Sequence, residues 1–134
     1  MLKTLTPNLM VEDVRTTVDW YSSVLGFTSD AEVPGEGEAV QFAIVHRDNV
    51  RLMFQSRKSL TSDLPLLQGK PIGSSQTFYI EVDAIEDLRR QVEGKLEIIK
   101  DLHDTFYGTR EFYFTDCNGY ILSFSQELAS SAQQ

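Results

Sequence analysis

The sequence repeats one order of predicted elements, and this repeat constrains the fold more than any other feature. Each half contains an extended segment, an amphipathic helix and about three further extended segments. The segments assigned to strands are 9–11, 27–33, 40–46 and 50–55 in the first half, and 78–82, 96–99, 111–115 and 120–125 in the second. A helix that follows one strand and precedes others packs on one face of their sheet. We therefore predict an α+β fold of two βαβββ modules.

Both predicted helices carry start and stop signals. Asp13 is an N-cap for the first helix, and Gly26 supplies the left-handed residue that ends it. Its apolar stripe at helical spacing consists of Val14, Val18, Tyr21 and Leu25. In the second helix, Asp83 is the predicted cap and Glu86 its capping-box partner. Ile85, Leu88 and Val92 form the stripe of this helix, which Gly94 ends.

The segment between the halves is rich in residues that break regular structure. Its residues 56–75 include Pro65, Gly69, Pro71 and Gly73, so we predict an irregular connection. The expected boundaries are about 1–58 for the first module, 59–75 for the linker and 76–128 for the second module. Ala129–Gln134 is expected to fray. Two such modules side by side form a half-barrel with a cleft, and their exposed sheet edges favour a homodimer.

Composition narrows the function classes. The 134 residues contain 12 Lys and Arg against 20 Asp and Glu, a formal net charge of -8, which argues against a nucleic-acid partner. This charge suits a cationic ligand, although acidic surfaces also serve solubility alone. The single cysteine, Cys117, fits a reducing compartment. No apolar run is long enough for a membrane helix and the N-terminus lacks an apolar signal, so we expect a cytoplasmic protein without a membrane partner.

Two motifs at opposite ends of the chain resemble one known family. Leu9-x-Val11-x-Asp13-Val14 with Trp20-Tyr21-x-x-Val24-Leu25-Gly26-Phe27 is similar to the opening signature of the glyoxalase/bleomycin-resistance superfamily, the vicinal oxygen chelate fold. Tyr107-Gly108-x-Arg110-Glu111-Phe112 and Asp116-x-Asn118-Gly119-Tyr120 resemble its closing signature, with Cys117 where the family usually has proline. Both motifs specify a fold and neither is catalytic. The resemblance is strongest to the metal-free bleomycin-resistance members, and it also implies a homodimer.

The positions that the resemblance assigns to metal ligands do not carry metal ligands here. Metal-dependent members bind one divalent ion with His and Glu from four strands. The corresponding residues are Thr6, Met53, Thr77 and Ser123. Thr77 lies 71 positions after Thr6 and Ser123 lies 70 after Met53, as a duplicated module requires. Neutral hydroxyls and a thioether make a poor site for a hard divalent ion. We therefore predict no metal and no other cofactor.

Other chemistry has little support in the sequence. We expect His46 beside a polar turn and His103 in a charged loop at 100–104, with His103 the better candidate to contact a ligand. Cys117 lies in a turn and no Gly-x-Ser-x-Gly elbow occurs, so no nucleophile is predicted. One enzymatic hypothesis stays open, in which Glu81 acts as a general base with a raised pKa.

Strand alternation assigns polar and aromatic side chains to the face opposite the helices. The ligand-binding residues predicted from this alternation and from the resemblance are Met53, Gln55, Thr77, Tyr79, Glu81, Tyr107, Tyr113 and Ser123. Tyr107 matches the position at which bleomycin-resistance proteins have an aromatic residue that stacks a planar drug. Arg110 and Glu111 are expected to pair with neighbours. The alternative is that the whole set packs across the half-barrel without a ligand.

These observations predict a metal-free small-molecule binding protein that sequesters a bleomycin-like or other aromatic, cationic antibiotic. The alternative is a metal-dependent lyase, isomerase or dioxygenase of the same superfamily, against which the replaced ligands argue. A third interpretation is a structural or regulatory dimer without a ligand.

Overall fold

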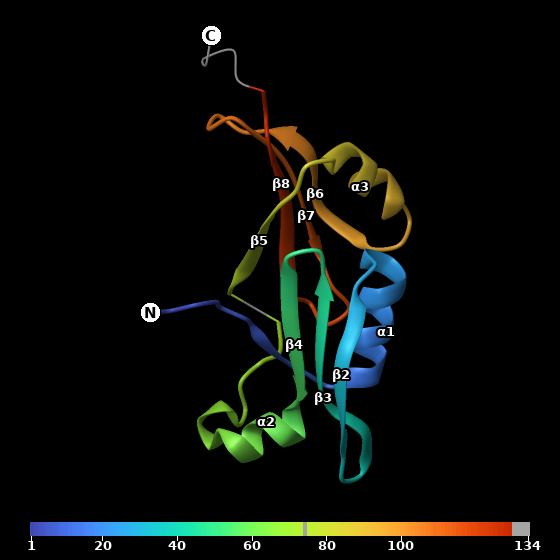
Figure 1. The fold of residues 1–134 in the computed structure, drawn as a ribbon, viewed down its shortest axis with the longest axis vertical. Coiled ribbons are helices and arrows are strands. Elements are labelled where there is room, and N and C mark those ends of the chain that lie inside the picture. Colours follow the sequence, from blue (N-terminus) through green and yellow to red (C-terminus); the bar gives the residue numbers. More distant parts are fainter. Residues whose placement is uncertain (74, 130–134) are drawn as a thin grey trace. The chain divides into compact units, whose positions relative to one another are not determined.

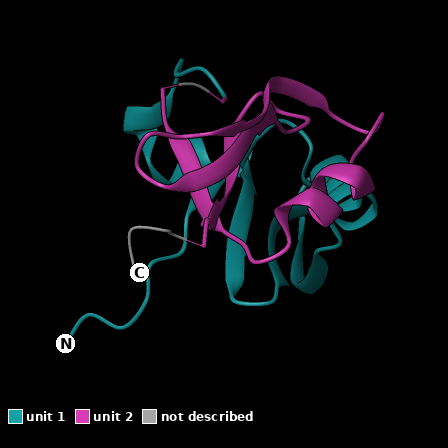
Figure 2. Ribbon diagram, turned by 90° about the horizontal axis from the view of Figure 1, so that it is seen from above, with its two compact units in different colours: residues 1–72 teal, residues 73–134 magenta. Residues whose placement is uncertain are grey.

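The computed structural model describes residues 1–73 and 75–129, which form two compact units (Figure 2). The first unit comprises residues 1–72 and the second begins at Gly73. This boundary falls within residues 59–75, the segment assigned above to the linker. Within the described ranges, every helix is too short or too polar to cross a membrane.

The first unit is a four-stranded sheet with a helix packed on it. Its elements are β1 (Asn8–Val11), α1 (Val14–Leu25), β2 (Thr28–Gly35), β3 (Glu38–Arg47) and β4 (Val50–Ser56). The strand order is β1-β4-β3-β2, in which β1 runs parallel to β4 and the other neighbours are antiparallel. Figure 1 shows α1 beside this sheet, where it contacts β3 and β4.

Helix α1 begins and ends where the sequence predicts. The Asp13 carboxylate accepts a hydrogen bond from the backbone N–H of Thr16 at 2.9 Å, and Gly26 follows the helix with a φ of 72°. The predicted apolar stripe is buried, and the ring of Tyr21 packs 4.9 Å from that of Phe54 on β4. Because Phe54 faces the helix, strand alternation places Met53 and Gln55 on the other face of the sheet.

A short helix interrupts the stretch that was predicted to be irregular. Helix α2 (Arg57–Asp63) follows β4 directly, and a 3₁₀ turn (Pro65–Leu67) comes next. The Ser56 hydroxyl caps α2 by accepting a hydrogen bond from the N–H of Ser59 at 3.2 Å, and Leu60 anchors the helix by its burial. The prediction was wrong here because it rested on Pro and Gly residues that all follow the helix, and it overlooked the serine cap that begins it.

The second unit has the same topology as the first. Its elements are β5 (Thr77–Glu81), α3 (Ile85–Gln91), β6 (Glu97–Asp104), β7 (Thr109–Thr115) and β8 (Ile121–Glu127), with strand order β5-β8-β7-β6. Asn8 lies opposite Met53 in the parallel pair of the first unit, and Tyr79 lies opposite Ser123 in that of the second. These pairs are related by the offsets of 71 and 70 residues that the sequence repeat shows. The α+β fold with two βαβββ modules is confirmed.

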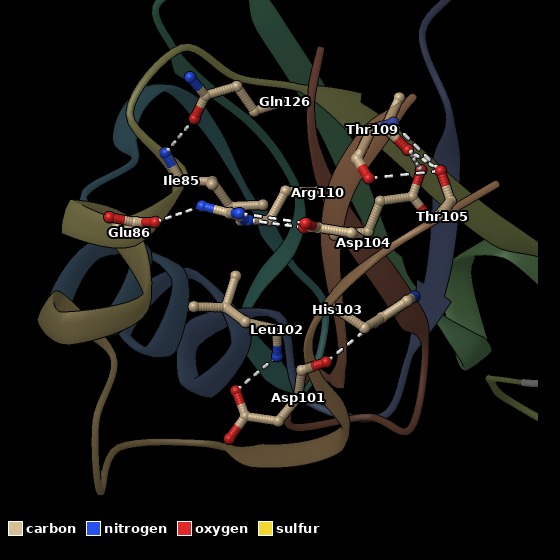
Figure 3. A network of polar contacts seen from close by, with 11 residues as sticks. Ile85, Glu86, Asp101, Leu102, His103, Asp104, Thr105, Thr109, Arg110 and Gln126 are labelled. Carbon is tan, nitrogen blue, oxygen red and sulfur yellow. Dashed lines mark hydrogen bonds and ion pairs between the residues drawn. The ribbon is translucent and has the colours of Figure 1, made fainter. Parts of the chain in front are cut away.

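The start of α3 differs from the prediction. The N-cap position is Ala84, not Asp83, and it makes no side-chain capping bond. The N–H of Ile85 instead donates to Oε1 of Gln126 on β8 at 2.9 Å (Figure 3). Glu86 does not complete a capping box, because its carboxylate accepts a hydrogen bond from Arg110 at 2.5 Å. A side chain 41 residues away in the sequence therefore caps this helix.

Strand β6 is longer than the predicted segment 96–99. His103 lies within it, opposite Glu111 of β7, so the prediction of a loop at 100–104 was wrong. Arg110 fixes this region because it donates to Asp104 of β6 at 2.7 Å and to Glu86 of α3, as Figure 3 shows. The expectation that Arg110 pairs with neighbours is confirmed. Register shifts near Lys100 explain why a simple alternating pattern did not extend the strand in the sequence.

Gly73 is the glycine whose replacement should disturb the second unit most. Its φ is 75°, and a Cβ added there would lie 2.6 Å from the carbonyl oxygen of Asn118. We expect Gly73→Ala to lower the free energy of unfolding by about 2 kcal/mol, since a left-handed alanine and a backbone clash both add strain. Gly94→Ala is the control, because Gly94 has a φ of 74° and no atom within 4 Å of the added Cβ. Equal melting temperatures for the two variants would contradict the predicted clash between the added Cβ at Gly73 and the Asn118 carbonyl oxygen.

Candidate functional site

The second sheet has one apolar and one polar face. Four side chains on β7 and β8 form a buried apolar cluster on the first face, and their aromatic rings lie 5.2 to 5.8 Å apart. These residues are Phe112, Phe114, Leu122 and Phe124. The alternate positions of β7 and β8 carry polar side chains, with Glu111 opposite Ser125 and Tyr113 opposite Ser123. Tyr79 on β5 lies opposite Ser123 on the same face.

A buried carboxylate lies at the centre of the polar face. Glu111 is 1% exposed, and hydroxyl groups surround both of its oxygens. Oε1 accepts hydrogen bonds from Tyr113 at 2.7 Å and Tyr107 at 3.1 Å. Oε2 accepts from Thr109 at 2.8 Å and Ser125 at 2.9 Å. We call these four residues together with Tyr79 the hydroxyl cluster.

Tyr79 is connected to Glu111 through Ser125. Its phenol oxygen lies 2.7 Å from the Ser125 hydroxyl and 3.3 Å from Oε2 of Glu111. A phenol has a single proton, so the shorter contact receives it and Ser125 donates onward to the carboxylate. No described Lys, Arg or His forms an ion pair with Glu111. The hydroxyl cluster therefore stabilises a buried charge without a cation.

The hydroxyl cluster also sets the protonation states of the site. Burial by itself raises the pKa of Glu111. The hydrogen bonds from Tyr113, Thr109, Ser125 and Tyr107 together have a larger effect in the opposite direction, and they lower the pKa to about 2. The pKa of Tyr113 lies above its ordinary value of 10.0, mainly because Tyr113 donates a hydrogen bond to Glu111 and secondly because it is partly buried. At neutral pH, Glu111 is thus ionised and a weak base. It is better suited to provide a permanent negative charge than to accept a proton during a reaction.

A cavity of about 390 Å³ lies beside the hydroxyl cluster, entirely within the second unit. This volume is within the usual range for small-molecule sites. Tyr79 and Tyr107 contribute half-exposed rings, and three carboxylates belong to the wall. The lining residues are Tyr79, Glu81, Val82, Asp83, Tyr107, Thr109, Ser125, Gln126 and Glu127. None of these is a lysine, arginine or histidine, so the wall of the cavity is acidic.

The structure places the predicted site residues of the second unit in three groups. Tyr79, Glu81 and Tyr107 line the cavity. Tyr113 and Ser123 lie on the same face of the sheet, where Tyr113 bonds to Glu111 and Ser123 is buried. Thr77 is exposed at the first position of β5. Their role in ligand binding stays a prediction.

Glu111, Thr109 and Ser125 are not among the site residues predicted from the sequence. Glu111 was expected to pair with neighbours, and its five hydroxyl contacts show that it does. A usable signal was present. The sequence predicts that Tyr113 lies on the face opposite the helices, and strand alternation then places Glu111 and Thr109 on that face as well. The signal in the sequence is therefore the alternation that places Thr109, Glu111 and Tyr113 on one face.

The two predicted site residues of the first unit lie on β4. Gln55 is buried and its amide is fully engaged. It accepts from Asn8 at 2.9 Å and donates to Ser59 and Asp63 of α2, each at 2.9 Å. Met53 is half-buried and lies opposite Asn8 on the neighbouring strand. Gln55 thus joins β1, β4 and α2, and its ligand-binding role remains an expectation.

The metal-ligand positions of the family do not fit a divalent ion in this chain. The four positions that the resemblance assigns to metal ligands carry Thr6, which precedes β1, and Met53, Thr77 and Ser123 on β4, β5 and β8. Their donors are three neutral hydroxyls and a thioether, which bind hard cations poorly. Over residues 1–73 and 75–129, no group of three or more His, Cys, Asp or Glu is placed to hold a metal ion.

Both histidines have neighbours of their own. His46 contacts the Asp30 carboxylate through Nδ1 at 2.7 Å. His103 bonds through Nδ1 to the backbone oxygen of Asp101 at 2.8 Å, and its ring lies edge-on to Tyr113 at 5.2 Å. The register therefore brings His103 next to the hydroxyl cluster, although it does not line the cavity.

The fold and its sequence identify the family. The sequence profile of the Glyoxalase/Bleomycin resistance protein/Dioxygenase superfamily matches residues 3–124. The chain belongs to this superfamily. It is 27% identical over 133 residues to proteins named bleomycin resistance protein from Geobacillus stearothermophilus and Staphylococcus aureus. Each alignment covers 92% of this chain and 96% of the relative.

Solved structures show the same fold at lower sequence identity. TioX from Micromonospora sp. ML1 is 19% identical with a TM-score of 0.72, covering 94% of this chain and 99% of that one. A protein of unknown function from Agrobacterium tumefaciens is 17% identical with a TM-score of 0.78, covering 96% of both chains. The prediction of the superfamily from the two terminal motifs is confirmed.

Proposed function

We propose that this protein binds an aromatic, cationic small molecule in the cavity of the second unit and protects a cell by sequestering it. The observation that carries the proposal is the buried, ionised Glu111 with its hydroxyl cluster beside an acidic cavity. Such a wall attracts cations, while Tyr79 and Tyr107 offer rings for stacking. The relatives named bleomycin resistance proteins support a drug of that class as the ligand.

The arrangement favours binding over catalysis. The donor set at the family's metal positions does not suit a divalent ion, and the low pKa of Glu111 makes it a weak proton acceptor at neutral pH. As the sequence predicts, we propose that the protein acts as a cytoplasmic homodimer, with the exposed edge strand β2 available for pairing. Light scattering on a size-exclusion column measures this oligomeric state.

The first test is a calorimetric titration with metal-free bleomycin, together with melting curves. We expect saturable binding and a rise in melting temperature, since a ligand that binds only the native state stabilises it. Absence of binding at millimolar drug would overturn the assignment of this ligand class. Turnover of a glyoxalase or dioxygenase substrate by the protein would instead favour the enzymatic alternative.

Glu127→Gln should weaken the binding of bleomycin about fivefold at low salt. Glu127 is exposed and lines the cavity, and an ion pair at an exposed site contributes about 1 kcal/mol. Glu97→Gln is the matched control, because it removes the same charge from β6 at an exposed position outside the lining. In 0.5 M salt the Debye length is on the order of 3–5 Å, so screening should reduce the difference in bleomycin affinity between the two variants, as calorimetry can measure. Equal affinities of the two variants at low salt would contradict the placement of the ligand.

A further inference from the structure

The directions of the hydroxyl protons determine what the cavity can offer a ligand. An ionised carboxylate only accepts hydrogen bonds, and each hydroxyl has one proton to donate. Tyr113, Thr109, Ser125 and Tyr107 direct their protons to Glu111. Tyr79 directs its proton to Ser125. Every hydroxyl proton of the cluster is thereby donated to Glu111 or to another member of the cluster.

The phenol oxygens of Tyr79 and Tyr107, two residues of the lining, consequently have only lone pairs left for a ligand. The carboxylates of Glu81, Asp83 and Glu127 on the same wall are also acceptors. Among the described lining residues, the side-chain donor with no partner of its own is the amide nitrogen of Gln126, whose oxygen bonds to Ile85. The cavity wall is therefore rich in acceptors and poor in donors.

We propose that Glu111 sets this hydrogen-bond polarity, so that the cavity selects a cationic group carrying N–H donors over a cation without them. Ammonium, amidinium and guanidinium groups can donate to the Tyr79 and Tyr107 oxygens, whereas a quaternary ammonium group offers only charge. Glu111 is thus a specificity-determining residue that acts through the hydroxyls of its neighbours. This inference rests on the proposed function and narrows its ligand class.

Two aromatic monocations separate hydrogen bonding from charge. Benzamidine carries N–H donors, and benzyltrimethylammonium carries none. We expect the wild-type protein to bind benzamidine about tenfold more tightly in calorimetric or NMR titrations, since one charge-assisted hydrogen bond contributes about 1.5 kcal/mol or more. A shared cavity is shown by displacement of each cation with metal-free bleomycin.

Glu111→Gln should abolish most of this tenfold preference. A glutamine amide has two donor protons and one acceptor oxygen, so some hydroxyls of the cluster must accept from it and turn their protons toward the cavity. Glu97→Gln is the control, because it removes a carboxylate of the same charge from an exposed position on β6, outside the lining, without changing the cluster. It should leave the affinities of both cations nearly unchanged and their ratio near ten.

Tyrosine substitutions keep the proposal testable if Glu111→Gln does not fold. Tyr79→Phe and Tyr107→Phe retain the rings and remove the acceptor oxygens, so each should weaken benzamidine several-fold more than benzyltrimethylammonium. Equal binding of the two cations by the wild type, or no binding of either while bleomycin binds, overturns the inference and leaves the proposed function standing. Failure of bleomycin and both cations to bind overturns the proposed function itself.

Discussion

Replacing Phe112 by alanine is expected to lower the free energy of unfolding by about 3–5 kcal/mol, the usual cost of deleting a buried aromatic ring. Phe112 is 0% exposed, and its ring lies 5.8 Å from that of Phe114 and 5.5 Å from that of Phe124. These three rings and Leu122 form the buried apolar cluster of the second sheet. The substitution leaves a cavity that the surrounding strands cannot fill, and urea unfolding followed by circular dichroism measures the loss.

Phe106→Ala provides the matched control for this prediction. Phe106 belongs to the same unit, but its side chain is 100% exposed in the connection between β6 and β7. Its replacement should change the free energy of unfolding by no more than about 0.5 kcal/mol, as for most surface substitutions. A loss for Phe112→Ala as small as that for Phe106→Ala would show that the apolar cluster does not stabilise the second unit.

Much of the fold could be predicted because its strongest signals are local or repeated. Asp13 and Gly26 bound α1 through contacts with residues within five positions. Alternation of side chains along β7 and β8 separates Phe112 and Phe124 from Glu111 and Ser125 without knowledge of the sheet. The duplication then transfers the topology of one half to the other. These features depend on residues that are close in the sequence or at fixed offsets.

The remaining features depend on contacts between distant residues. Gln126 on β8 caps α3, whereas the local sequence pattern predicted that Asp83 would cap this helix. The surroundings of Glu111 come from three strands and a connecting loop, and Tyr79 lies 32 positions away from it. Only the strand order β5-β8-β7 brings these groups together. The position of Glu111 on the polar face could therefore be predicted from the sequence, but the hydroxyl groups around it could not.

Glu111→Gln is expected to remove a large part of the acid sensitivity of the protein. The pKa of Glu111 is about 2 in the folded protein, against an ordinary value of 4.5. Because the folded-state pKa is the lower one, ionised Glu111 stabilises the native state above pH 4.5, and this contribution is lost as the pH falls toward 2. The difference between the two pKa values corresponds to about 3 kcal/mol at neutral pH.

Urea unfolding at pH 7 and pH 2 measures this contribution. The wild type should lose about 3 kcal/mol more than Glu111→Gln between the two pH values, since glutamine has no proton to gain. Glu97→Gln removes an exposed carboxylate from β6 and should follow the wild-type curve. Parallel curves for the wild type and Glu111→Gln would mean that the hydroxyl cluster does not hold Glu111 ionised. The acceptor-rich wall of the cavity would then lose its physical basis, because a protonated Glu111 would donate a hydrogen bond to the cluster.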